Sequence, residues 1–355
     1  MNNDGYSFLL YNSQNATQTF IADISRLCKN VSMTWRLNNV DDLSFSLNIE
    51  AWREYCADTG IDPYTTLRPL TSEIKVQYKG VFLPGAFEVQ ISSREFGTDD
   101  KTISVQARTT LAKLGYRWIK KVYTQVDAAD IARDMISVTQ AKQYGNYGIT
   151  FGNTYLTGVP TDRKYDYYTI SDAIKNLSDD ISGGFDFYFD HDWKFYTMAK
   201  RGSVRNSKTF VYGDEVSNVK EFKNPDDGTV IRNAMTIIGQ GIGDPIISAP
   251  NTDTVSAQTY YLREGTLTYS NIDNPTWLDT TSKNEVRDRK QPYDLPTLVV
   301  VEDELNINEI FVGDTIPIEC RDALSPYMGN GRIKEISINL DDNFYAQYGL
   351  ELLKV

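Results

Sequence analysis

Hydrophobic and polar residues alternate at every second position in short runs along much of the chain. From Leu43 to Ile49 the odd-numbered positions are apolar, and the run over residues 33–37 follows the same rule before a polar break. Two such runs joined by a polar break predict a β-hairpin. Further runs at residues 72–93 and 101–108 predict an antiparallel sheet that closes into a tube-like β-barrel over residues 1–107.

The period changes in the middle of the chain, where two short segments carry apolar residues at helical spacing. One segment follows Asp127 and the other follows Ser171, and both residue types are good N-caps. The apolar positions are Ile131, Met135, Val138, Ile174, Leu177 and Ile181. We therefore expect two helices, each packed on a sheet by one narrow stripe, in an α/β module across residues 108–205, with the second helix ending at Gly183-Gly184.

The stretch "GGFDFYFDHDWKFYTM", from Gly183 to Met198, contains two aromatic runs of period two on either side of Asp190, His191 and Asp192. The runs predict a β-hairpin, and the three polar residues fall in its turn. A metal or acid/base site would need convergent ligands, which neighbouring side chains in a tight turn seldom provide. We therefore interpret the only histidine as a turn residue and expect no metal site.

Strand patterns return after residue 205, and we expect residues 206–245 and 296–355 to form a second tube-like antiparallel β-barrel. Gly, Pro, Asn and Asp are frequent between these segments, which predicts an inserted excursion over residues 246–295. The glycine-rich "GQGIGDPIISAP" is not a dinucleotide loop, because the required third glycine falls at Asp244 and a proline follows it. The predicted fold class is mainly β with an α+β insertion.

Composition and motifs exclude several classes of protein. The 355 residues are 41% hydrophobic, enough for a sizeable core, yet no apolar run reaches the ~18 residues that span a bilayer. The three cysteines are far apart, which excludes a disulfide framework. The sequence has no nucleophile elbow, Walker loop or HExxH motif, so we expect no catalytic residue and no cofactor. Adjacent carboxylates such as Asp41 and Asp42 fit turns better than a glycosidase pair.

Charge distribution indicates one candidate interface. The formal net charge of −12 argues against general affinity for nucleic acid. Between Asp100 and Asp127, however, the chain has six basic residues, several aromatic residues and no acidic one. Either nucleic acid or an acidic neighbouring subunit could bind such a segment, and the net charge favours the subunit. The interface candidates are Lys113, Arg117, Trp118, Lys120 and Lys121.

A family resemblance rests on four segments in order. They are "DAIKNLSDDISGGFDFYFDHDWKFYTM", "TFVYGDEVSNVKEFKNPDDGTVIRNAMTIIGQG", "FVGDTIPIEC" and "GRIKEISINLDDNFYAQYGLELL". Together they resemble the tail hub proteins of tailed phages, which are related to the baseplate hub of contractile tails and to the N-terminal region of tail-associated lysins. The resemblance covers most of residues 30–355 through loose patterns, and the loop at residues 144–168 has no matching motif.

The resemblance implies a structural protein rather than an enzyme. Two tube-like barrels per chain would assemble as a homotrimer, whose pseudo-sixfold ring joins the hexameric tail tube to the three-fold tail tip. Implied partners are the distal tail protein, the tail tube or tape measure protein, tail fibre or spike proteins, and double-stranded DNA in passage. The place would be the virion tail tip after synthesis in the host cytoplasm. The alternatives are a carbohydrate-binding or glycosidase-like tail-tip protein and the hub of a phage-derived contractile injection machine.

Overall fold

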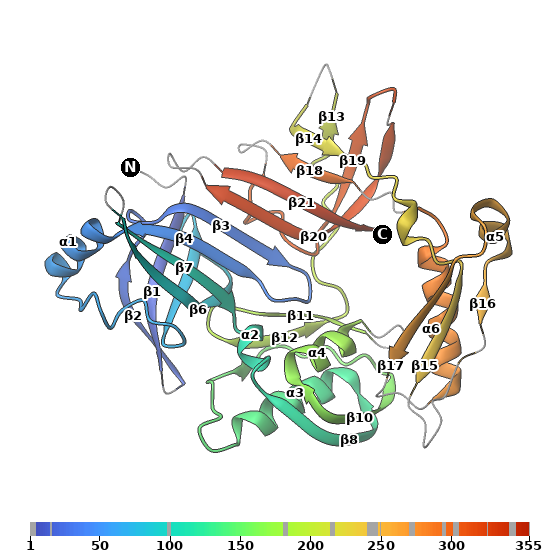
Figure 1. The fold of residues 1–355 in the computed structure, drawn as a ribbon, viewed down its shortest axis with the longest axis horizontal. Helices are drawn as coiled ribbons and strands as arrows, with labels where there is room; N and C mark the ends of the chain where they lie inside the picture. The colour runs from blue at the N-terminus through green and yellow to red at the C-terminus, as the bar shows by residue number, and fades with distance from the viewer. Residues whose placement is uncertain are drawn as a thin grey trace.

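A computed structural model gives the fold of the chain (Figure 1). The structure describes residues 5–14, 16–97, 101–179, 184–213, 217–239, 248, 250–269, 274–292, 296–300, 305–324, 326–340 and 346–354. Strands dominate these residues, which confirms the expectation of a mainly β fold with an α+β insertion.

Thirteen strands form one continuous sheet built from both ends of the chain (Figure 1). The first strand set comprises β1 (Tyr6–Gln14), β2 (Thr17–Asp23), β3 (Lys29–Arg36), β4 (Asp42–Asn48), β5 (Ser72–Tyr78), β6 (Val81–Phe96) and β7 (Lys101–Thr109). The second strand set comprises β13 (Phe210–Tyr212), β14 (Val219–Lys223), β18 (Thr297–Val300), β19 (Thr315–Cys320), β20 (Tyr327–Leu340) and β21 (Ala346–Lys354). Hydrogen bonds connect the strands in the order β14-β18-β21-β20-β3-β4-β7-β6-β5-β1-β2, with β19 on β20 and β13 on β19.

The two strand sets meet where β3 pairs antiparallel with β20. Trp35 lies opposite Ile336, and Thr34 lies opposite Ser337. Alternating side chains of both sets enter one hydrophobic core, and the hydroxyls of Tyr6 and Tyr348 lie 3.0 Å apart inside it. The sets are therefore fused through a shared core and a shared sheet.

Helix α1 (Ile49–Thr59) covers part of this core. The Asn48 side chain caps it by accepting from the backbone N–H groups of Glu50 and Ala51, and Gly60 ends it in the left-handed conformation with φ 71°. Its buried residues are Ile49, Trp52 and Cys56. The helix thus packs on the first strand set through one narrow face.

The middle module has its own core below the first strand set (Figure 1). Its elements are α2 (Leu111–Leu114), β8 (Trp118–Asp127), α3 (Ala128–Gln140), β9 (Thr150–Phe151), β10 (Pro160–Thr169), α4 (Ile170–Ser178), β11 (Asp186–Phe189) and β12 (Lys194–Met198). Strands β8 and β10 form an antiparallel ribbon whose inner face, with Tyr123 and Tyr165, joins the core that α3 and α4 enter. Strands β11 and β12 form the predicted aromatic hairpin.

The helix caps agree with the sequence in one case and differ in the other. Asp127 caps α3 by accepting from the N–H of Ala129, as predicted. Thr169, not Ser171, caps α4, because the chain turns two residues earlier and leaves Ser171 buried within the helix. Val138 is exposed on α3. Ile181 and Gly183 lie outside the described residues.

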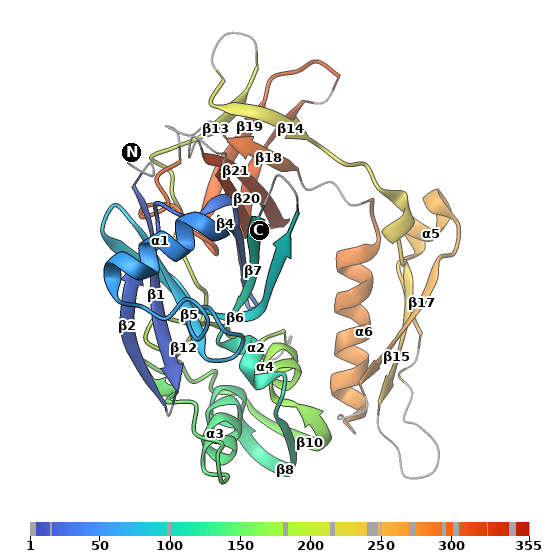
Figure 2. The ribbon, with the colours of Figure 1, turned by 60° about the vertical axis from the view of Figure 1, so that its left-hand side comes forward.

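A third small unit stands to one side of the molecule in both views (Figures 1 and 2). It comprises η1 (Gly228–Val230), β15 (Ala234–Gly239), β16 (Asn251–Thr252), α5 (Thr254–Tyr260), β17 (Glu264–Tyr269) and α6 (Pro275–Arg289). We expected β15 in the second barrel, but it pairs with β16 and β17 instead. Met235 and Ile237 account for this difference, because they pack with Leu278 and Val286 of α6.

Candidate functional site

The turn at Asp190, His191 and Asp192 is held by backbone bonds and by the first strand set. Oδ1 of Asp190 accepts from the backbone N–H groups of Asp192 and Lys194, both at 2.9 Å, which confirms the turn. The imidazole of His191 stacks on Phe82 with ring centroids 4.3 Å apart, and burial lowers the pKa of His191. Within the described ranges, no group of three or more His, Cys, Asp or Glu side chains could hold a metal ion.

Lys113 occupies the interior of the chain, which corrects its assignment as an interface residue. Its side chain is 6% exposed and forms ion pairs with Glu73 and, at 3.4 Å, with Glu88. Its Nζ lies 4.6 Å from the centroid of the Trp193 ring, and the Trp193 indole N–H donates to both carboxylate oxygens of Glu73 at 3.0 Å. We call Lys113, Glu73, Glu88 and Trp193 the buried ion cluster. It joins α2 and the aromatic hairpin to β5 and β6.

The carboxylates of the buried ion cluster, Glu73 and Glu88, were not predicted from the sequence. Glu73 alternates with Ile74 in a pattern typical of a solvent-facing strand residue. The aromatic hairpin covers that face, so the strand is buried on both sides. One feature of the sequence could have indicated them: no acidic residue lies near Lys113 in the sequence, so an ion-pair partner of Lys113 must come from a distant segment.

Two of the five interface candidates lie together on the outer face of the ribbon. Trp118 is 49% exposed and its ring centroid lies 4.8 Å from that of Tyr167. Lys120 places its Nζ 4.7 Å from the Tyr167 ring, and Lys142 places its Nζ 4.6 Å from the Trp118 ring. We call Lys142, Trp118, Tyr167 and Lys120 the aromatic-lysine row. An ion pair with Asp166 at 3.2 Å raises the pKa of Lys120.

The remaining two candidates bind groups of their own module. Arg117 donates to the side chain and the carbonyl of Thr139, at 2.9 and 3.2 Å. Lys121 forms an ion pair with Asp134 at 2.6 Å. Both side chains are therefore held within their own module, and the outer face of the ribbon offers chiefly the aromatic-lysine row.

The outer face of the large sheet carries polar side chains across the junction of the two strand sets. One row of directly paired residues runs Asn339, Ser32, Ser44 and Gln106 over β20, β3, β4 and β7. The next row runs Ser337, Thr34, Asp42 and Arg108 over the same strands. We call these two rows the polar sheet face.

Asp41 marks a second enclosed polar site, between β3, β4 and the aromatic hairpin. Its Oδ1 accepts from the backbone N–H of Arg36 at 2.7 Å, and a small cavity beside it is lined by Phe187 and Arg201. The residue as a whole is half-buried, yet desolvation of its carboxylate raises the pKa of Asp41 to about 7. The neighbouring Arg36 and Arg201 oppose this increase, and Asp42 adds to it.

We expect Asp41→Asn to remove a pH dependence of stability. Because the folded-state pKa of about 7 lies above the unfolded value, Asp41 favours the folded state at low pH and loses that contribution as pH rises to 7. Between pH 5 and pH 8 the free energy of unfolding of wild type should therefore fall by roughly 2–3 kcal/mol more than that of the variant. Urea denaturation at both pH values measures this difference. The control Asp58→Asn, on the exposed side of α1, should show the same change in stability between the two pH values as wild type. If Asp41→Asn also showed the same change as wild type, the assignment of the pH dependence to Asp41 would be wrong.

Comparisons with known proteins rest on structure, since no protein-family model and no curated protein matches the sequence. The tail protein from Neisseria meningitidis MC58 is similar with a TM-score of 0.67 and 13% identity, over 99% of this chain and 97% of that one. The 43 kDa tail protein of prophage MuSo2 from Shewanella oneidensis has a TM-score of 0.65 and 12% identity, over 98% and 97%. The E. coli c3393 protein, a component of the type VI secretion system with structural similarity to T4 tail proteins gp27 and gp5, has a TM-score of 0.51 and 10% identity, over 92% and 73%. The chain therefore has the fold of phage tail proteins, which confirms its resemblance to tail hub proteins at the level of the fold.

Proposed function

We propose that this chain is the structural tail hub protein of a tailed bacteriophage, acting without catalysis at the tail tip of the virion. The observation that carries the proposal is the likeness to phage tail proteins over nearly the whole chain. Each chain contains two fused strand sets. A closed ring of three chains would present six strand sets, which matches a hexameric tail tube on one side and a three-fold tip on the other.

The polar sheet face is the side that we assign to the DNA channel. Phosphates bind to lysine and arginine side chains that carry uncompensated charge. On this face Arg36 and Arg108 both form ion pairs with Asp42, and Arg36 also pairs with Glu335 at 2.8 Å. The neighbouring side chains are hydroxyls and amides. Such a surface hydrates a passing duplex and offers it few cations, which suits transit rather than binding.

The aromatic-lysine row is the contact that we assign to the neighbouring subunit. Exposed tryptophan and tyrosine rings supply the anchors on which interface energy usually concentrates. Lys142 beside them donates to the carbonyl of Trp118, a neutral group, so its charge can attract a neighbour whose formal charge is −12. The further partners, the distal tail protein, tail tube or tape measure protein and tail fibre or spike proteins, would then bind the two ends of the ring.

The proposal predicts a trimer that a double variant of the row dissociates. Wild type should sediment as a trimer at micromolar concentration, and Trp118→Ala with Lys120→Glu should shift it toward monomer, because the variant loses an anchor and gains like-charge repulsion. Higher salt should also loosen the wild-type trimer through screening over a Debye length of ~8–10 Å. Lys283→Glu is the control, since Lys283 is equally exposed and also pairs with an aspartate, Asp279, but lies on α6.

Two results would count against this assignment. A wild-type chain that sediments as a monomer would remove the ring. A trimer that survives the double variant while a DNA gel shift disappears would show that the row binds nucleic acid instead.

The similarity to a type VI secretion component favours one second candidate, the hub of a phage-derived contractile injection machine. A neighbouring gene set with a contractile sheath and no capsid genes would support that candidate.

A further inference from the structure

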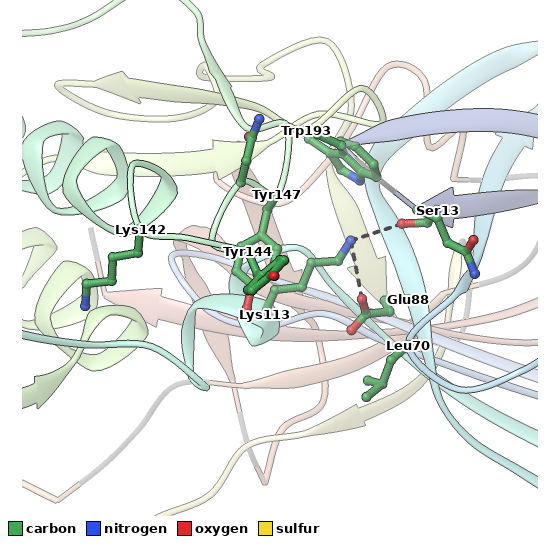
Figure 3. A pocket seen from close by; sticks show the side chains of 11 residues that line it. Ser13, Leu70, Glu88, Lys113, Lys142, Tyr144, Tyr147 and Trp193 are labelled. Carbon is green, nitrogen blue, oxygen red and sulfur yellow. Dashed lines mark hydrogen bonds and ion pairs between the residues drawn. The ribbon is translucent and has the colours of Figure 1, made fainter.

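An open pocket of about 530 Å³ lies where the first strand set meets α2 and the loop after α3 (Figure 3). Its lining includes Glu88 and Lys113 of the buried ion cluster on the inside, and Tyr144, Asn146 and Tyr147 from the loop. Its volume falls in the range of ~300–1,000 Å³ that is usual for small-molecule sites. Of the aromatic-lysine row, only Lys142 lines this pocket.

The polar groups of the pocket include both acceptors and donors of hydrogen bonds. The carboxylate of Glu88 accepts from Gln90 Nε2 at 2.7 Å and faces Lys113, and a carboxylate has about four acceptor positions in all. Asn146 uses Oδ1 to accept from the backbone N–H of Gly148, which leaves its amide N–H groups as donors. The Gln14 amide and the Ser13 hydroxyl complete the lining on the side of β1.

The loop that carries the two tyrosines is fixed by its backbone bonds. The amide of Gln140 holds Ile149 from both sides, accepting from its N–H at 2.7 Å and donating to its carbonyl at 2.9 Å. The N–H of Gly145 donates to the carbonyl of Lys142 at 2.8 Å, and a side chain at Gly145 would collide with the carbonyl oxygen of Thr139. Tyr144 is nevertheless 92% exposed. The loop backbone therefore keeps Tyr144 in the lining of the pocket, where its ring offers an exposed apolar surface.

Charged ligands fit this pocket less well than neutral ones. Lys113 is already bound by two carboxylates, so it has little charge left for an anion. Lys142, the other lysine of the lining, points away from Lys113 in Figure 3 and lies over the Trp118 ring. Glu73 and Glu88 balance the charges of Lys113 and Lys142, so the groups around the pocket carry no net charge that would hold a cation either. A ligand with hydroxyl groups and an apolar face is left as the best match.

We propose that this pocket binds a neutral saccharide. A pyranose ring has a face of C–H groups that can lie on an exposed tyrosine, and hydroxyl groups that both donate and accept hydrogen bonds. The tyrosines of the loop offer the aromatic surface, Glu88 accepts from the hydroxyls, and Asn146, Gln14 and Ser13 can donate to them. The sugar would thus be held between the loop after α3 and the first strand set.

The test measures direct binding of three probes to the whole chain by saturation-transfer NMR and tyrosine fluorescence. The probes are N,N′-diacetylchitobiose, maltose and lactose. We expect at least one probe to bind, and Tyr144→Ala to weaken its binding about fivefold to tenfold. Tyr261→Ala is the matched control. Tyr261 is 80% exposed and has a positive φ of 61°, as Tyr144 has a φ of 57°, but it follows α5, far from the pocket in the sequence. Its binding should equal that of wild type.

Several outcomes would overturn the saccharide site. The first is that none of the three probes binds at roughly 20 mM. The second is that Tyr144→Ala binds a probe as tightly as wild type does, and the third is that both tyrosine variants weaken binding equally. A change in the sedimentation of Tyr144→Ala would show that a neighbouring copy fills the pocket, which also rejects the proposal. The double variant of the aromatic-lysine row changes Trp118 and Lys120, neither of which lines the pocket, so the two proposals fail separately.

Discussion

Replacing Lys113 by methionine is expected to lower the free energy of unfolding by ~3–5 kcal/mol. Methionine keeps most of the side-chain volume and removes the ammonium group. Glu73 and Glu88 would then remain in the interior, with hydrogen bonds from Trp193, Gln18 and Gln90 in place of a counter-ion. Breaking a buried ion pair from one side is costly because the partner charge has neither water nor a counter-ion. Urea denaturation at pH 7, followed by fluorescence, measures the loss.

Two further variants separate this explanation from a simple loss of packing. Lys120→Met makes the same chemical change in an exposed ion pair and should leave stability nearly unchanged. Adding Glu73→Gln to Lys113→Met removes one of the unpaired charges and should recover part of the loss. If Lys113→Met proved as stable as wild type, or if Glu73→Gln deepened the loss, the buried ion cluster would not have the role assigned to it.

Trp35→Ala is the second substitution with a large expected effect, a loss of ~3–5 kcal/mol in the free energy of unfolding. Trp35 is 1% exposed, and its indole N–H donates to the carbonyl of Pro84 at 3.0 Å. Its ring contacts Phe87 of the first strand set and Phe311 beside the second, with centroids 5.9 and 5.7 Å apart. Truncation would therefore leave a cavity at the junction of the two strand sets.

The form of the unfolding transition tests the shared core. Because both strand sets enter one core, the transition of Trp35→Ala should move as a whole to lower denaturant concentration, with tryptophan fluorescence and circular dichroism changing together. Trp118→Ala removes an exposed tryptophan and should keep the wild-type midpoint when both are measured as monomers. Two separated transitions in Trp35→Ala, one of them at the wild-type midpoint, would mean that the strand sets unfold independently.

Local patterns predicted those elements whose residues interact with close neighbours in the sequence. The aromatic hairpin was predictable because its two runs of period two flank a turn that Asp190 stabilises from within. The start of α3 was predictable because Asp127 caps the helix by accepting from the N–H of Ala129, only two residues away. In both cases the stabilising contacts span a few residues, so a short window of sequence contains both partners.

Contacts between distant segments explain what the sequence did not predict. The residues next to Lys113 in the sequence are typical of an exposed basic residue. It is buried because it contacts Glu73 and Trp193, which lie 40 and 80 positions away in the sequence. The strand that contains Met235 has the pattern of a barrel strand, and its assignment to another sheet depends on α6. The exposed row of Trp118 and Tyr167 also depends on pairing between β8 and β10.

The pairing of β3 with β20 also has a consequence for how the chain folds as it is made. Trp35 and Ile336 are directly paired although about 300 residues of chain separate them, so one edge of β3 has no strand beside it until β20 leaves the ribosome. At a synthesis rate of about 5–20 residues per second, that delay is roughly 15–60 seconds. Closure of so long a loop is also an intrinsically slow step. Until β20 is synthesised, the nascent N-terminal half therefore exposes an unpaired strand edge that a cell's chaperones would have to protect from aggregation.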